Sequence, residues 1–152
     1  MKTTFPKALF GSIALAGAVA LVGGCGSAPG SPAAEMVAGD KVVLTGASEV
    51  PPSVTTAAGS GTVTIRPDHT VSAIIAVAGM TATAAHIHEG AAGTSGPVIV
   101  PLTKTSDNTF AAPDGAKLTD SQYASYKAGN LYVNVHSAKY PGGEIRAQLK
   151  SN

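Results

Sequence analysis

The stretch Gly61-Thr62-Val63-Thr64-Ile65-Arg66, followed by Pro67-Asp68-His69 and then by Thr70 to Val77, decides the fold class. In its first part the apolar residues Val63 and Ile65 alternate with threonines, which is the period-two pattern of a strand with one buried face. The three residues in the middle have the composition of a turn, and apolar residues resume after them. The stretch therefore predicts a β-hairpin.

Further short β-rich runs surround this hairpin, with turn residues between them. They occupy residues 42–45, 86–88, 97–102, 131–136 and 144–149. Spacing of roughly ten residues between such runs is typical of a β-sandwich or a β-barrel. One segment differs, because Thr119 to Lys127 predicts a short helix, with Thr119 or Asp120 as its N-cap and Gly129 as its stop.

Alternation along the last two runs predicts which side chains point inward. The inward set is Leu131, Val133, Val135, Ile145, Ala147 and Leu149, and the outward set is Tyr132, Asn134, His136, Glu144, Arg146 and Gln148. By the same rule Ile87 points away from its neighbours His86 and His88. We therefore expect these histidines to lie off the core.

The first 24 residues have the pattern of an export signal. Lys2 and Lys7 give a positive start, and Ala8 to Val22 is almost wholly apolar or small, which is typical of a signal peptide. This apolar run is short and diluted by glycine, whereas a membrane-spanning helix needs about 20 predominantly apolar residues. We therefore predict that residues 1–24 are a signal peptide.

The residues that follow resemble the lipobox of bacterial lipoproteins: Leu21-Val22-Gly23-Gly24-Cys25. The resemblance implies that the thiol of Cys25 carries diacylglycerol, and that the new amino terminus can take a further acyl chain such as palmitate. Two or more chains make membrane anchoring stable. We expect an extracytoplasmic lipoprotein anchored to the bacterial cell membrane or outer membrane.

The mature chain divides into two parts. Residues 25–40 are rich in glycine, serine, alanine and proline and have too little apolar bulk to fold, so they predict a flexible tether. Residues 41–150 are long enough for one domain. Cys25 is the only cysteine, which leaves this domain without a disulfide or a thiolate metal site.

The charge of the mature chain argues against a nucleic-acid partner. Loss of Lys2 and Lys7 with the signal leaves eight basic against nine acidic residues, and the sequence has no tryptophan and only 5% aromatic residues. Phosphate contacts and base stacking need a basic patch and aromatic side chains. Nucleic-acid binding is therefore disfavoured.

Several motifs of the mature chain occur together in the CHRD (chordin) domain, which the sequence resembles over about Lys41 to Leu149. They are residues 44–46, 49–52, 85–90, 96–100, 132–137 and 141–146. The resemblance implies an all-β fold, an immunoglobulin-like antiparallel β-sandwich of the Greek-key type with one short helix. It implies little about activity, since the family includes animal chordin and many bacterial secreted proteins.

Three histidines are the candidate metal ligands. His86 and His88 are two residues apart on one predicted strand, so both imidazoles point to the same side. If the strand of His136 lies nearby, three imidazoles converge, a set suited to copper or zinc. The alternative is structural: the three rings hydrogen-bond loop carbonyls or Glu144 and hold the glycine-rich segment 89–96, itself predicted to be a plain flexible connection.

Two functions follow from these residues. One is a noncatalytic module of the cell envelope that binds a protein or another envelope component, and the other is copper or zinc binding through the three histidines. Glu144 and Arg146, which project to one side two residues apart, are candidates to support the cluster or to pair with each other. An enzyme is the least favoured reading, because the sequence places no nucleophile beside a base.

Overall fold

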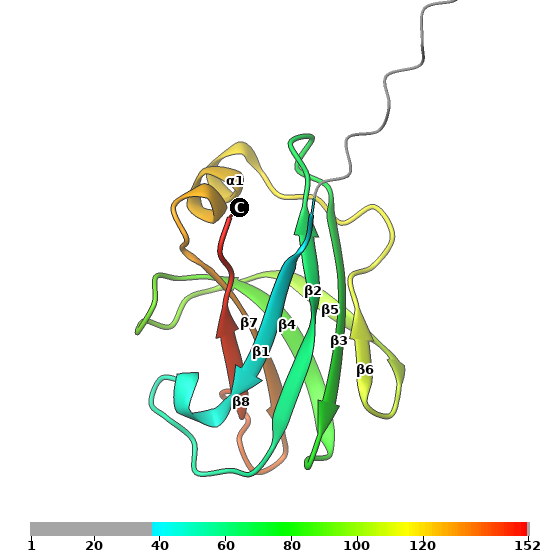
Figure 1. Cartoon of the computed structure of the whole chain (residues 1–152), viewed down its shortest axis with the longest axis vertical. Coiled ribbons are helices and arrows are strands. Elements are labelled where there is room, and N and C mark those ends of the chain that lie inside the picture. Colours follow the sequence, from blue (N-terminus) through cyan, green and yellow to red (C-terminus); the bar gives the residue numbers. More distant parts are fainter. Residues whose placement is uncertain (1–37, 152) are drawn as a thin grey trace, which may run out of the picture. The chain divides into compact units, whose positions relative to one another are not determined.

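The computed structural model describes residues 38–151 (Figure 1). The predicted signal peptide, Cys25 and all but the last residues of the predicted tether lie outside this range. The strands of the described part are β1 (Asp40–Thr45), β2 (Ala58–Ile65), β3 (Val71–Ala78), β4 (Ala82–Glu89), β5 (Val98–Ser106), β6 (Thr109–Ala111), β7 (Leu131–Ser137) and β8 (Ile145–Gln148). The helices are the short 3₁₀ turn η1 (Gly46–Ser48) and α1 (Asp120–Lys127). Within residues 38–151, no helix has the length and apolar character that crossing a membrane requires.

The predicted hairpin and helix are confirmed. Strands β2 and β3 pair antiparallel from Ala58 opposite Ala78 to Ile65 opposite Val71, and the turn between them places His69 at a φ of 68°. Helix α1 begins after Thr119, whose side chain accepts a hydrogen bond from the backbone of Gln122, while the Gln122 side chain accepts one from the backbone of Thr119. This capping box satisfies two backbone donors of the first turn.

The expected immunoglobulin-like sandwich is wrong, because the sheet closes into an antiparallel barrel. The strand order is β1-β2-β3-β6-β5-β4-β7-β8, and β8 returns to pair with β1. Two connections join what would otherwise be two open sheets. Strand β6, which the sequence did not reveal, lies between β3 and β5, and Thr45 of β1 pairs with Arg146 of β8. A ring of hydrogen bonds therefore replaces the free edges of a sandwich.

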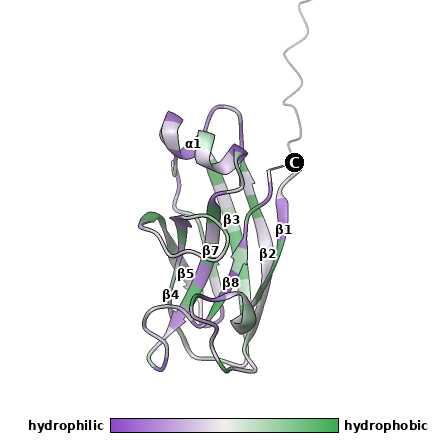
Figure 2. Ribbon diagram, turned by 90° about the vertical axis from the view of Figure 1, so that its left-hand side faces the viewer, coloured by the Kyte–Doolittle hydropathy of each residue, from purple (hydrophilic) through white to green (hydrophobic). Residues whose placement is uncertain are grey.

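The barrel interior holds the core. In Figure 2 the strands carry most of the hydrophobic colour, and polar and apolar residues alternate along β7. The predicted inward residues of β7 and β8 are buried, and so is the apolar Ile87 between the two histidines of β4. Burial of each such aliphatic side chain stabilises the fold by about 1.5–3 kcal/mol. These residues fix β4, β7 and β8 side by side, which positions the polar side chains on their outer face.

Candidate functional site

The polar residues of β4, β7 and β8 form rows across the outer face of the barrel. Strand β7 lies between the other two. One row runs from His86 through Asn134 to Arg146, and the next from His88 through Tyr132 to Gln148. His136 lies opposite Ala84, which is two residues before His86 on β4 and therefore on the same face. Neighbouring strands are about 4.8 Å apart, so side chains in these rows are in contact range.

Much of this outer face is buried as deeply as the core. Tyr132 is 3% exposed and Asn134 and Arg146 are each 2% exposed, although all three point away from the barrel interior. Strand alternation predicted their side correctly. It did not predict that loops cover them, since alternation indicates a direction and not what lies there.

One of the covering loops is the segment between β4 and β5. Arg146 donates to the carbonyl oxygen of Thr94 at 2.8 Å, and the Gln148 amide donates to that of Gly90 at 3.0 Å. The backbone N–H of Gly96 donates to the hydroxyl of Tyr132 at 3.1 Å. Residues 89–96 are therefore more than the plain connection that the sequence predicted, because some of their backbone groups find hydrogen-bond partners on the outer face.

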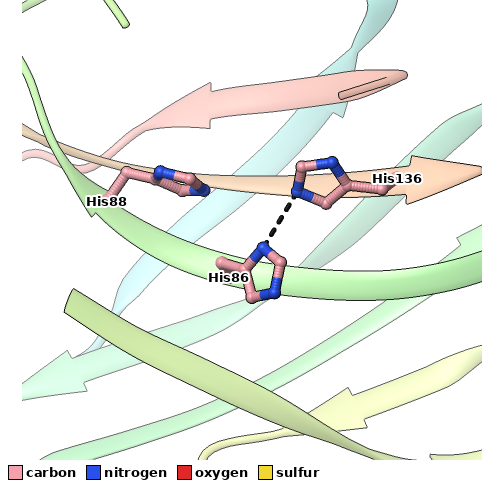
Figure 3. A group of neighbouring side chains, drawn as sticks. All are labelled: His86, His88 and His136. Carbon is pink, nitrogen blue, oxygen red and sulfur yellow. Dashed lines mark hydrogen bonds between the residues drawn. The ribbon is translucent and has the colours of Figure 1, made fainter. Parts of the chain in front are cut away.

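The structure brings the three predicted histidines together (Figure 3). Nδ1 of His86 lies 2.9 Å from Nε2 of His136, and each ring offers one nitrogen within 4.8 Å of those of the other two. His86 is partly exposed, whereas His88 and His136 are 7% and 9% exposed. The convergence depends on β4 pairing with β7, which the sequence left open.

Two of the rings have their protons fixed by the backbone. Nδ1 of His88 lies 2.9 Å from the carbonyl oxygen of Gly96, and Nδ1 of His136 lies 2.9 Å from that of Pro141. A carbonyl oxygen only accepts, so both Nδ1 atoms carry the proton. In the neutral rings Nε2 is then an unprotonated acceptor. Nε2 of His136 accepts from Nδ1 of His86, while Nε2 of His88 is buried without a hydrogen-bond partner among the described residues.

The structural and the metal-binding interpretations of the histidines are therefore compatible. His88 and His136 do hold loop carbonyls, as the structural interpretation expects, but each uses only one nitrogen for this. Metal-ligating histidines usually donate their second ring N–H to a carbonyl or carboxylate, which orients the ring. The hydrogen bonds that hold the loops thus also orient the Nε2 lone pairs of His88 and His136 toward the centre of the cluster.

Burial favours the neutral form of two of the three rings, His86 and His136. Desolvation lowers the pKa of His86, and the neighbouring His136 and His88 lower it further. Desolvation also lowers the pKa of His136, an effect partly offset by its hydrogen bond to Pro141. Near pH 7 these rings are therefore unprotonated, which is the form that binds a metal.

These lowered pKa values predict that the fold loses stability in weak acid. Below about pH 6.5 the histidines of the unfolded chain bind protons more readily than those of the folded chain. The free energy of unfolding is therefore unaffected by these groups above that pH and decreases as the pH falls below it. We expect the free energy of unfolding, measured with urea, to fall between pH 7.5 and pH 5.5. The loss is at most about 1.4 kcal/mol per pH unit for each histidine.

A His86→Gln variant is the control for this prediction. The buried carboxyls Asp40 and Glu49 have raised pKa values, so they change stability with pH in the opposite direction, and they do so in both proteins. The difference in pH dependence between the two proteins therefore reports the contribution of His86. An identical pH dependence in wild type and variant would contradict a role for His86.

The predicted supporting residues are not paired with each other. Glu144 accepts a hydrogen bond from the hydroxyl of Thr55 at 2.6 Å. The guanidinium of Arg146 instead lies 3.3 Å from the centre of the Tyr132 ring, which stacks on His88 at 4.8 Å with the rings 5° from parallel. Arg146 thus reaches the histidine cluster through an intervening aromatic ring, and Glu144 holds the loop that contains Thr55.

Two further buried residues of this face were missed by sequence reasoning. Glu49 and Asn134 are 6% and 2% exposed, and one oxygen of each is buried without a hydrogen-bond partner in the described range. Burial raises the pKa of Glu49, and the charge of Arg146 and hydrogen bonds from Val50 and Asn134 partly counter this. Alternation placed Asn134 on the outer face, but no pattern around Glu49 indicated that its loop folds over that face.

The family model of the CHRD domain matches residues 41–149. This match covers β1 to β8 and includes all three histidines. No curated protein and no solved structure matched the chain.

Proposed function

Because the chain belongs to the CHRD domain family, we propose that it is a noncatalytic binding module, and that its domain binds a copper or zinc ion through His86, His88 and His136. Family membership supports a binding or interaction module in general terms. The arrangement of the three histidines supports the more specific proposal, because imidazole suits both metals.

One observation carries the metal proposal: Nε2 of His88 is buried and lacks a hydrogen-bond partner among the described residues, while Nδ1 of the same ring is fixed on Gly96. A buried polar atom without a partner costs about 1–3 kcal/mol of stability. A metal ion bound to this nitrogen removes that cost. The ion would also bind Nε2 of His136, which without metal accepts a hydrogen bond from Nδ1 of His86.

Binding of the metal requires a tautomer change at His86. Its Nδ1 donates to His136, so that proton must leave before Nδ1 can bind an ion. The proton can return to Nε2 of the same ring, because His86 is only partly buried. The ring then remains neutral, and no net proton is released near pH 7.

The metal proposal is tested by titrating Cu(II) and Zn(II) into the full chain in detergent, with Cys25→Ser in every sample so that no thiol competes. We expect one ion per chain with a Kd below about 1 μM. In His88→Ala and His86→Ala the affinity should fall at least about 100-fold, whereas His69→Ala, which removes the only histidine outside the cluster, should leave it unchanged. The partly exposed His86 provides a variant that spares the buried face.

Binding weaker than about micromolar, or binding that ignores the His86 and His88 substitutions, would remove the metal from the proposal. The remaining function would be a noncatalytic module that binds a protein or another component of the cell envelope.

The proposed location is outside the cytoplasm, on a lipid anchor at Cys25. The apolar run before this cysteine, its small neighbours and the Gly/Ser/Pro-rich residues after it support the proposal. Cells fed radiolabelled palmitate should label the wild-type chain and leave Cys25→Ala unlabelled. Equal labelling of both proteins would contradict the anchor.

A further inference from the structure

We infer that the histidine site prefers Cu(I) to Zn(II) and Cu(II), an inference that rests on the proposed metal-binding function. The first argument is the composition of the ligand set. It consists of the three imidazoles His86, His88 and His136, and within residues 38–151 no carboxylate or thiolate joins this group. A bound ion therefore keeps its full charge, because none of these ligands is an anion.

The second argument is the cost of placing that charge in a buried site. His88 and His136 are less than one-tenth exposed. The desolvation cost of an ion rises with the square of its charge, so a dication costs about four times as much as a monocation in the same site. Cu(I) is the monocation among the metals that imidazole binds well.

The charged groups around the cluster do not reverse this preference. Arg146 reaches it through the ring of Tyr132 and adds positive charge on the side of His88. Glu49 faces Arg146, and Glu144 accepts from Thr55, so neither carboxyl belongs to the group of possible ligands. Neither carboxyl therefore neutralises the ion by direct coordination, and the charge of the metal itself remains the deciding quantity.

The third argument is the number of ligands. Cu(I) is stable with three nitrogen ligands in a plane, whereas Zn(II) takes four ligands in a tetrahedron and Cu(II) favours a tetragonal set, so each dication needs at least one more ligand, such as a water, beyond the three imidazoles. Ligand nitrogens about 2.0 Å from a trigonal ion are about 3.5 Å apart. The nitrogens here start 2.9 Å apart for His86 and His136 and within 4.8 Å for all three, so side-chain movements of about an ångström complete the site.

The test compares the three ions on the full chain in detergent with Cys25→Ser. Cu(I) is measured without oxygen against a chromophoric Cu(I) chelator, and Zn(II) and Cu(II) are measured against chelators of known affinity. We expect the Kd for Cu(I) to be at least about 100-fold lower than that for Zn(II). X-ray absorption of the Cu(I) form should show three nitrogen neighbours, and two in His86→Ala.

The outcomes separate this inference from the proposed function. Zn(II) or Cu(II) binding that equals or exceeds Cu(I) binding, and that depends on His86 and His88, overturns the preference and leaves the metal site in place. Cu(I) binding that is unchanged in His86→Ala and His88→Ala assigns the ion to other ligands, such as the methionines, and overturns the inference. Absence of binding by all three ions overturns both the inference and the metal site.

Discussion

Arg146→Met is expected to lower the free energy of unfolding by about 3–5 kcal/mol, because it removes a buried charge that donates several hydrogen bonds and leaves the buried carboxyl of Glu49 without a nearby positive charge. The Arg146 side chain is 2% exposed and lies against the face of Tyr132. It also donates to carbonyl oxygens of Thr94 and Ala91 in the loop that covers the site. Methionine fills much of the volume but donates no hydrogen bond, so these carbonyls lose their donor, and the carboxyl of Glu49 loses the positive charge that lowers its pKa.

Urea unfolding measures this effect, and Arg66→Met is the matched control. Arg66 is exposed at the turn between β2 and β3, where a substitution should change stability by no more than about 0.5 kcal/mol. Arg146→Lys keeps the charge but not the planar fork of donors, so it should recover only part of the loss. If the free energies of unfolding of Arg146→Met and Arg66→Met differ by less than about 1 kcal/mol, the guanidinium of Arg146 does not hold the loop.

Gly96→Ala is expected to have the second largest effect, a loss of about 2–4 kcal/mol. A Cβ on Gly96 would overlap the carbonyl oxygen of Glu89, so the backbone must shift. That shift breaks the hydrogen bonds that Gly96 makes with His88 and Tyr132, and each buried group left unpaired costs about 1–3 kcal/mol. Loss of the bond to His88 also frees its ring to rotate.

The control for this substitution is Gly142→Ala, because open space surrounds a Cβ there and the backbone is not left-handed. Urea unfolding of the two variants gives the stability comparison. Metal titration gives a second readout, since losing the hydrogen bond that orients a ligand typically costs 10–100-fold in affinity. Equal stability of Gly96→Ala and Gly142→Ala would show that the loop tolerates the extra methyl group.

The sequence predicted local elements well because their signals are local. The alternation around Val63 and Ile65 marked the β2–β3 hairpin, and Thr119 marked the start of α1. Closure of the barrel depends on weaker and more distant signals. Strand β6 is three residues long with Phe110 as its single large apolar residue. Strands β1 and β8 lie near opposite ends of the domain sequence and pair only at Thr45 and Arg146. Without those two connections, a sandwich was the natural expectation.

The candidate site was predictable to the same extent. Period two placed His86 and His88 on one side, and a polar alternation placed His136 on the outer face of its strand. Their convergence required the register of β4 against β7, which no local pattern contains. The burial of this face required Gly96 to pass close to Glu89 and the loop of Glu49 to fold back, and both are tertiary contacts.

The ring of strands also limits how the domain can meet other molecules. Each described strand has a neighbour on both sides, but β1 meets β8 only at Thr45 and Arg146, so a peptide could add as an extra strand only along short unpaired stretches. Closure thus reduces the chance that crowded copies template one another's backbones, a common route to aggregation among proteins with open sheets. A partner that recognises this domain must therefore bind mainly its loops and side chains, and the loops over the histidines are held in place by His88 and His136.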